Sequence, residues 1–151
     1  MQKMRIMLVD DEERFLSTTK RLLEKRGVTT ATAVSGVEAL EKLRMENVHV
    51  VILDVKMPGM DGIETLAEIK RLYPLVEVIM LTGHGTIESA VEGLKSGAMD
   101  YLTKPADIDE LIAKAEEAFE RRTRLEEKIR TAQARKFMKS PRQILREAEE
   151  S

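Results

Sequence analysis

Residues 50–62 read VVILDVKMPGMDG, and this stretch joins an apolar run to a single charged residue. Four consecutive apolar residues precede Asp54, after which the chain is expected to turn at Pro58 and Gly59. The pattern predicts a buried strand of a parallel sheet that ends at a carboxylate. Because burial of an ionised group is costly, a charge in this position indicates a function.

Four further apolar segments and five amphipathic ones surround this stretch. The predicted strands are residues 4–9, 28–34, 48–53, 76–81 and 99–102, and the second alternates as an edge strand would. Two of the predicted helices cover residues 12–26 and 86–96. The other three begin after Ser35, Asp61 and Asp107, and each of these residues has a Glu three positions later, as in a capping box. Gly27 and Gly97 follow helix ends. Five βα units with short connections predict an α/β fold whose parallel sheet is covered on both faces.

Composition and charge limit the class of protein. The 151 residues fit one domain with a modest extension, and 42% hydrophobic residues suffice for a core. The absence of Cys excludes disulfides and thiol chemistry, and the apolar runs are too short for a signal peptide or membrane span, so we expect a cytoplasmic protein. Residues 1–120 carry 15 Lys and Arg against 22 Asp and Glu, whereas residues 121–151 carry 10 against 5. The chain therefore divides into an acidic body and a basic tail.

Polar residues follow four of the five predicted strands. They are Asp10 and Asp11 after the first strand, Asp54 after the third, Thr82 after the fourth and Lys104 after the fifth. Ligands of parallel sheets bind at this carboxyl edge, so these side chains are expected to converge there. Three carboxylates with one ammonium would repel one another, which predicts a divalent cation. Mg²⁺ is the expected ion because it prefers oxygen ligands.

Two classes of enzyme are disfavoured by the same residues. A phosphatase of the haloacid-dehalogenase type needs a second Asp two residues after the first, where this chain has Lys56 after Asp54 and Glu12 after Asp10. A dinucleotide-binding enzyme needs a glycine-rich turn after the first strand, and the DDEE of residues 10–13 would repel a pyrophosphate. We therefore do not expect a turnover enzyme.

Four motifs together resemble one family. LVDDEE, VVILDVKMPGMDG, VIMLTGHG and AMDYLTKP look like the motifs of the receiver domain of two-component response regulators, in order and spacing, over roughly residues 4–120. The resemblance implies a five-stranded parallel sheet of order 2-1-3-4-5, a flavodoxin-like three-layer sandwich, and a commonly cis peptide bond between Lys104 and Pro105. It places the receiver at residues 1–122 and a helical tail or linker at residues 123–151. Ala106 departs from the Phe that often follows the KP pair.

The resemblance also implies an acceptor and a metal site. Asp54 would accept a phosphoryl group from a sensor histidine kinase or a phosphotransfer protein. Asp10 and Asp11 would form the acidic pocket, and Mg²⁺ would be held there with Asp54 and the backbone carbonyl of Lys56.

The remaining implied roles concern the phosphoryl group after transfer. Thr82 and Lys104 would contact its oxygens, and Thr82 with Tyr101 would form a switch. Lys56 and His84 would flank the path of hydrolytic water and tune the lifetime. The switch would reshape the surface made by the fourth helix, the fifth strand and the last helix, which an unknown downstream protein would read.

The sequence of the tail is compatible with more than one way of acting on other molecules. Leu111, Ala115, Ala118, Arg122, Leu125, Ile129 and Ala132 recur at steps of three and four with no Gly or Pro before Pro141, which predicts that the last helix continues past the domain. Its apolar seam favours a parallel homodimer or folding back on the body, with Ser140 and Pro141 capping a short terminal helix. Scattered basic residues are more typical of a solvated face than of a nucleic-acid surface. The chain is then a single-domain regulator or, alternatively, the receiver and linker of a longer DNA-binding transcription regulator.

Overall fold

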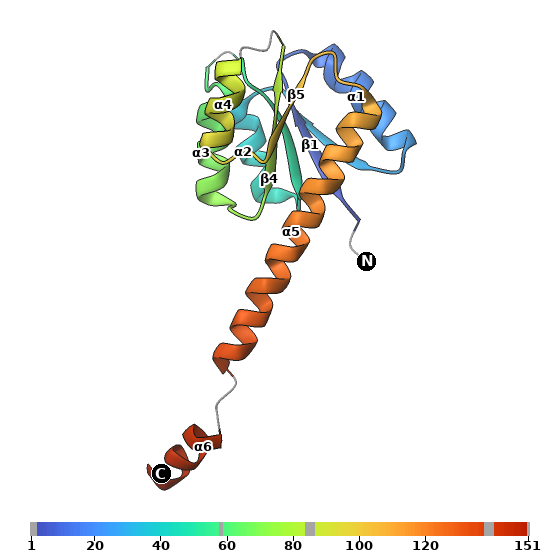
Figure 1. The fold of residues 1–151 in the computed structure, drawn as a ribbon. Coiled ribbons are helices and arrows are strands. Elements are labelled where there is room, and N and C mark those ends of the chain that lie inside the picture. Colours follow the sequence, from blue (N-terminus) through green and yellow to red (C-terminus); the bar gives the residue numbers. More distant parts are fainter. Residues whose placement is uncertain (1–2, 58, 84–86, 138–140, 151) are drawn as a thin grey trace.

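A computed structural model describes residues 3–57, 59–83, 87–137 and 141–150. Strands and helices alternate along the chain (Figure 1). Their bounds are β1 Arg5–Val9, α1 Glu13–Lys25, β2 Thr29–Ala33, α2 Gly36–Met45, β3 Val50–Asp54, α3 Gly62–Leu72, β4 Glu77–Thr82, α4 Ile87–Lys95, β5 Asp100–Thr103, α5 Ile108–Phe137 and α6 Pro141–Glu150. The predicted strands and helices are confirmed to within a few residues at their ends.

The sheet has five parallel strands in the order β2-β1-β3-β4-β5, as the family resemblance implies. Strand β2 lies at an edge, in agreement with its alternating sequence. Every residue of β3 is buried, and so is every residue of β4, because these strands lie inside the sheet with helices on both faces. The carboxyl ends of β1, β3 and β4 therefore meet at one edge.

Two apolar clusters hold the helices against the sheet. On one face α2 and α3 pack through residues such as Leu43 and Leu66, and α4 lies beside α3 on that side (Figure 1). On the other face α1 and α5 pack through residues such as Leu23 and Leu111, and Ala106 joins this cluster. The three layers confirm the predicted flavodoxin-like sandwich.

The helix ends follow the signals in the sequence. Ser35 Oγ accepts the Glu38 N–H at 3.2 Å, and Asp61 Oδ1 accepts the Glu64 N–H at 2.8 Å, so both predicted caps are confirmed. Before α5, however, the Asp107 carboxylate accepts the N–H of Asp109 instead of that of Glu110. Gly27 and Gly97, which follow α1 and α4, have φ of 81° and 111°, a backbone conformation that favours glycine.

Helix α5 continues well past the sheet, as the spacing predicted (Figure 1). Residues 127–136 are all exposed, so this part of the helix does not fold back on the body. The predicted capping residue Ser140 lies outside the described residues, and α6 begins at Pro141. Among the helices of the described ranges, none has an apolar stretch long enough to cross a membrane.

Candidate functional site

Asp10 is held rigidly at the end of β1. Its N–H donates to the Ala33 carbonyl at 3.1 Å, which continues the pairing with β2, and its side chain is fully buried. Its Oδ1 accepts the Glu12 N–H at 2.9 Å, so the carboxylate also fixes the turn into α1. Asp11, the next residue, is exposed on the same turn.

Asp54 is the last residue of β3 and lies beside that turn. It is 6% exposed, and its Oδ1 accepts the Lys56 N–H at 3.2 Å. The start of α3 passes directly over this loop, since the Gly62 N–H donates to the Val55 carbonyl at 3.0 Å. A Cβ at Gly62 would collide with the Asp54 carbonyl oxygen, so a glycine is required there for the close approach.

Lys104 brings a positive charge to these carboxylates from the end of β5. Its Nζ lies 2.6 Å from Asp10 Oδ2, 3.4 Å from Glu12 Oε1 and 3.7 Å from Asp54 Oδ2. Burial lowers the pKa of Lys104, but the three carboxylates outweigh it and the pKa is raised. The ammonium also lies 4.8 Å from the centre of the Phe15 ring. The peptide bond to Pro105 is cis, as the resemblance implied.

Thr82 completes the edge at the end of β4. Its side chain is buried, and its hydroxyl donates to the Leu102 carbonyl at 3.3 Å. Leu102 directly follows Tyr101 in the chain. Tyr101 is 41% exposed. The hydroxyl therefore already connects the site to the strand that carries Tyr101.

The electrostatics of Asp54 are those of a crowded carboxylate. Burial and, next, the charge of Asp10 raise its pKa from 3.8 to about 6, although the Lys56 N–H and Lys104 act in the opposite direction. Asp10, Asp11 and Asp54 each offer an oxygen within 4.8 Å of the others. These oxygen donors fit a hard divalent cation such as Mg²⁺.

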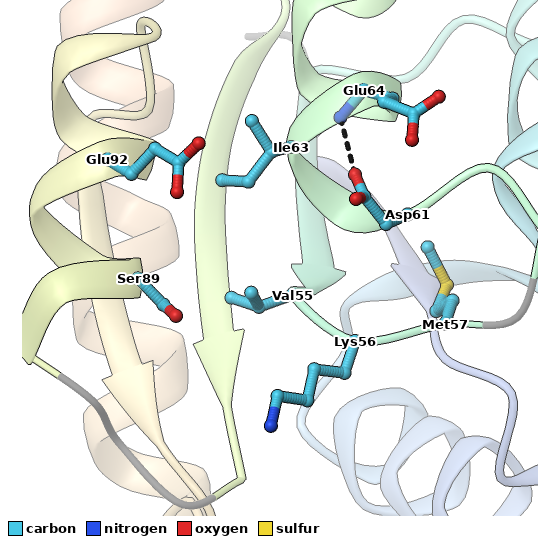
Figure 2. Close-up of a pocket in the computed structure, with 8 residues that line it drawn as sticks. All are labelled: Val55, Lys56, Met57, Asp61, Ile63, Glu64, Ser89 and Glu92. Atoms are coloured by element: carbon cyan, nitrogen blue, oxygen red, sulfur yellow. Dashed lines mark hydrogen bonds between the residues drawn. The ribbon is translucent and has the colours of Figure 1, made fainter.

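The site opens into a hollow of about 250 Å³. It is lined by Asp11, Glu12, Asp54, Val55, Lys56, Thr82, Gly83, Ser89 and Lys104. A neighbouring hollow of about 600 Å³ shares Val55, Lys56 and Ser89 with it and lies between α3 and α4 (Figure 2). Figure 2 shows Ile63 and Glu92 facing each other across this space, and the Asp61 cap at its margin. The smaller hollow holds the converging charges, so the chemistry belongs there.

Most of the predicted site residues converge as expected. Asp10, Asp11, Asp54, Thr82 and Lys104 meet at one edge of the sheet.

Other assignments are less direct. Lys56 contacts Asp54 through its backbone N–H while its side chain is exposed, and Tyr101 lies outside both apolar clusters. His84 lies outside the described residues. Sequence reasoning missed the contacts of Glu12 and Phe15 with Lys104, although their positions one and four residues after Asp11 place them at this edge.

Comparison with known proteins agrees with this geometry. Residues 6–116 match the response regulator receiver domain. Over 113 residues the chain is 45% identical to the transcriptional regulatory protein ZraR of Escherichia coli, covering 75% of this chain and 26% of ZraR. Over 118 residues it is 40% identical to the DNA-binding transcriptional regulator NtrC of the same organism, covering 78% and 25%. The chain thus spans about a quarter of the length of these curated relatives.

Solved structures give the same answer. The receiver domain of NtrX from Brucella abortus superposes with a TM-score of 0.72 at 38% identity, covering 76% of this chain and 98% of that one. A response regulator receiver domain protein from Clostridium thermocellum gives a TM-score of 0.76 at 38% identity, with 81% and 98% covered. With the matched motifs, the sheet order and the site geometry in agreement, the chain belongs to the response regulator receiver domain family.

Proposed function

We propose that this chain is a phosphorylation-dependent switch in which Asp54 accepts a phosphoryl group from a sensor histidine kinase or a phosphotransfer protein. The observation that carries the proposal is the approach of one ammonium, that of Lys104, to both Asp54 and Asp10 inside a hollow. The family membership supports the same assignment. The chain takes part in its own modification and is not a turnover enzyme.

The chemistry required of Asp54 is nucleophilic attack on phosphorus. Its carboxylate oxygen forms the new P–O bond while the P–N bond to the donor imidazole breaks, and the imidazole keeps the electron pair. With a pKa of about 6, Asp54 is largely ionised and nucleophilic at neutral pH. Two anions must approach, so the Lys104 ammonium, 3.7 Å from Asp54, would reduce their repulsion and bind a phosphoryl oxygen.

The three carboxylates suit a bound Mg²⁺. Asp10, Asp11 and Asp54 would hold the ion, with the backbone carbonyl of Lys56 as a further ligand. When bound, the ion supplies positive charge that offsets the carboxylates and the incoming phosphoryl oxygens. Among the described residues, the ammonium of Lys104 is shared by the carboxylates of Asp10, Glu12 and Asp54, and this excess of negative charge supports a metal requirement.

Thr82 would couple the modification to the protein surface. To reach a phosphoryl oxygen, its hydroxyl must leave the Leu102 carbonyl. The lost bond frees the backbone next to Tyr101, whose exposed ring could then turn inward. Such a switch is a shift between two populations, and its readout is the face formed by α4, β5 and α5, where a downstream protein would bind. Lys56 and His84 would flank the path of hydrolytic water and so set the lifetime of the phosphoryl group on Asp54.

A second proposal concerns the whole protein. The relatives named above are transcriptional regulators, of which this chain spans about a quarter. Helix α5 continues past the receiver without a break, as a linker to another domain would. We therefore also propose that this chain is the receiver and linker of a longer DNA-binding transcription regulator.

Labelling with a small phosphodonor tests the first proposal. Intact-mass measurement after incubation with acetyl phosphate and Mg²⁺ should show one added phosphoryl group on the parent chain and none on Asp54→Asn. Asp107→Asn, at an exposed aspartate that lines neither hollow, is the matched control and should be labelled like the parent. Equal labelling of Asp54→Asn, or many turnovers of a generic phosphate ester, would contradict the proposal. Full labelling in excess chelator would contradict the metal requirement.

A further inference from the structure

Helix α5 is attached to the edge of the sheet opposite the candidate site by two consecutive arginines. Arg121 Nε lies 3.5 Å from Glu77 Oε2 at the start of β4. Arg122 Nη1 donates to the Val48 carbonyl at 2.7 Å, just before β3 begins. We call Glu77, Arg121, Arg122 and the Val48 carbonyl the amino-edge anchor.

Glu77 is the buried partner in the anchor, and the Arg121 side chain that reaches it is 53% exposed. The Glu77 side chain is 4% exposed, and Lys70 of α3 lies 3.7 Å from its other oxygen. Lys70 also donates to the carbonyls of Pro74 and Val76 at 3.0 Å each. A buried carboxylate that loses a partner is strongly unfavourable, so Glu77 holds α3, β4 and α5 together.

Arg122 is fixed on both sides of its guanidinium. Besides the Val48 carbonyl, it binds Glu126 of its own helix, with Nε 2.9 Å from Oε1, and its side chain is 13% exposed. One residue after Val48, the His49 ring meets the Phe119 ring of α5 edge-on at 5.0 Å. The helix therefore leaves the body in a defined direction and then continues beyond the sheet (Figure 1).

The strands that the anchor contacts also carry the site at their other ends. Strand β3 ends at Asp54, and β4 ends at Thr82. We propose that the amino-edge anchor sets the direction of the α5 tail and transmits the change at Asp54 and Thr82 to it through β3 and β4. The transmitting part rests on the proposed function, whereas the part that sets direction does not. Such coupling requires that these strands shift between two arrangements when Asp54 is modified, and a changed distance to the tail is the sign of that shift.

Spin-label distances in the full chain test this proposal. The chain has no Cys, so Met45→Cys on α2 and Thr131→Cys on the tail can be labelled specifically, and Met45 is 83% exposed. Electron double resonance on doubly labelled chains diluted with an excess of unlabelled chain, so that only distances within one chain are measured, should give a narrow distance distribution for the parent. Adding Mg²⁺ and beryllofluoride, a phosphoryl mimic, should shift that distribution.

The variants Arg121→Gln and Arg122→Gln should broaden the distribution and lose the shift. Arg124→Gln, an exposed arginine of the same helix, is the matched control and should behave like the parent. Glu77→Gln tests the anchor from the sheet side and should broaden the distribution in the same way. Circular dichroism and stoichiometric labelling of Asp54 show that each variant is folded.

Two results would overturn the proposal. One is a distance distribution that, in both arginine variants, has the same width as in the parent and the same shift on adding the mimic. The other is a parent that is fully modified at Asp54 yet shows no shift. If the parent cannot be modified at all, the proposed function fails, whereas the widths measured without mimic still decide whether the anchor sets direction.

Discussion

Replacement of Asp54 by Asn should stabilise the metal-free protein at neutral pH. The folded protein raises the pKa of Asp54 from 3.8 to about 6, chiefly by burial and then by the charge of Asp10. Between these values the folded state binds a proton that the unfolded state has released, so stability falls as the pH rises through this window. Above pH 6 this loss of stability is complete, and below pH 3.8 no stability is lost.

The magnitude follows from the same pKa values. Each pKa unit corresponds to about 1.4 kcal/mol, so ionised Asp54, with a side chain 8% exposed, costs at most about 3 kcal/mol at pH 7. Asn carries no charge and keeps an oxygen that can accept the Lys56 N–H. We expect Asp54→Asn to raise the free energy of unfolding by about 1–3 kcal/mol at pH 7 and by much less at pH 4.

Urea titrations followed by circular dichroism in EDTA measure this difference. The matched control is Asp107→Asn, which should remain within about 0.5 kcal/mol of the parent at both pH values. Adding Mg²⁺ should stabilise the parent more than Asp54→Asn and reduce the gap. An Asn variant less stable than the parent at pH 7 without metal, or a gap that is equal at pH 4 and pH 7, would refute the reasoning.

Three further predictions concern other parts of the molecule. Lys104→Met removes the ammonium next to buried Asp10 and should lower the free energy of unfolding in EDTA by about 3 kcal/mol; an unchanged urea midpoint would contradict the ion pairs. Burial and, next, Arg122 lower the pKa of His49 below 6.5, so stability should fall as the pH drops from 6.5 toward that lower value. This pH dependence should be weaker in His49→Gln, and equal slopes would contradict it. The exposed Ile129 should support a parallel dimer, so light scattering should find a dimer that Ile129→Lys abolishes and Arg130→Lys keeps; a parent that is monomeric at high concentration would exclude it.

The sheet and the site were predictable because local patterns determine them. An apolar run that forms a parallel strand and ends at Asp54 places that carboxylate at the carboxyl edge of the sheet, and the same holds for Asp10 and Thr82. The Ser35 and Asp61 caps depend on residues three apart and were equally visible. Strand order came from the family resemblance and not from the periodicity.

The contacts between distant residues could not be predicted in this way. Glu77 resembles an ordinary charge at the start of a strand, and its burial depends on Lys70 and Arg121, which lie in other elements. In the sequence, Arg122 falls within the three- and four-residue spacing that predicts the apolar seam of the tail. The structure instead assigns its guanidinium to the Val48 carbonyl, so this residue belongs to the edge of the receiver. Such pairings follow from the packing of complete helices and leave no local signal.

The central claim is that Asp54 carries the phosphoryl group, and chemical trapping tests it most directly. Hydroxylamine attacks the acyl carbon of an aspartyl phosphate and releases phosphate, which leaves a hydroxamate on the modified residue. After incubation with acetyl phosphate and Mg²⁺, digestion and peptide mapping should locate the hydroxamate at Asp54 and at no other carboxylate. A hydroxamate at Asp10 or Asp11, or an equal yield from Asp54→Asn, would contradict the account.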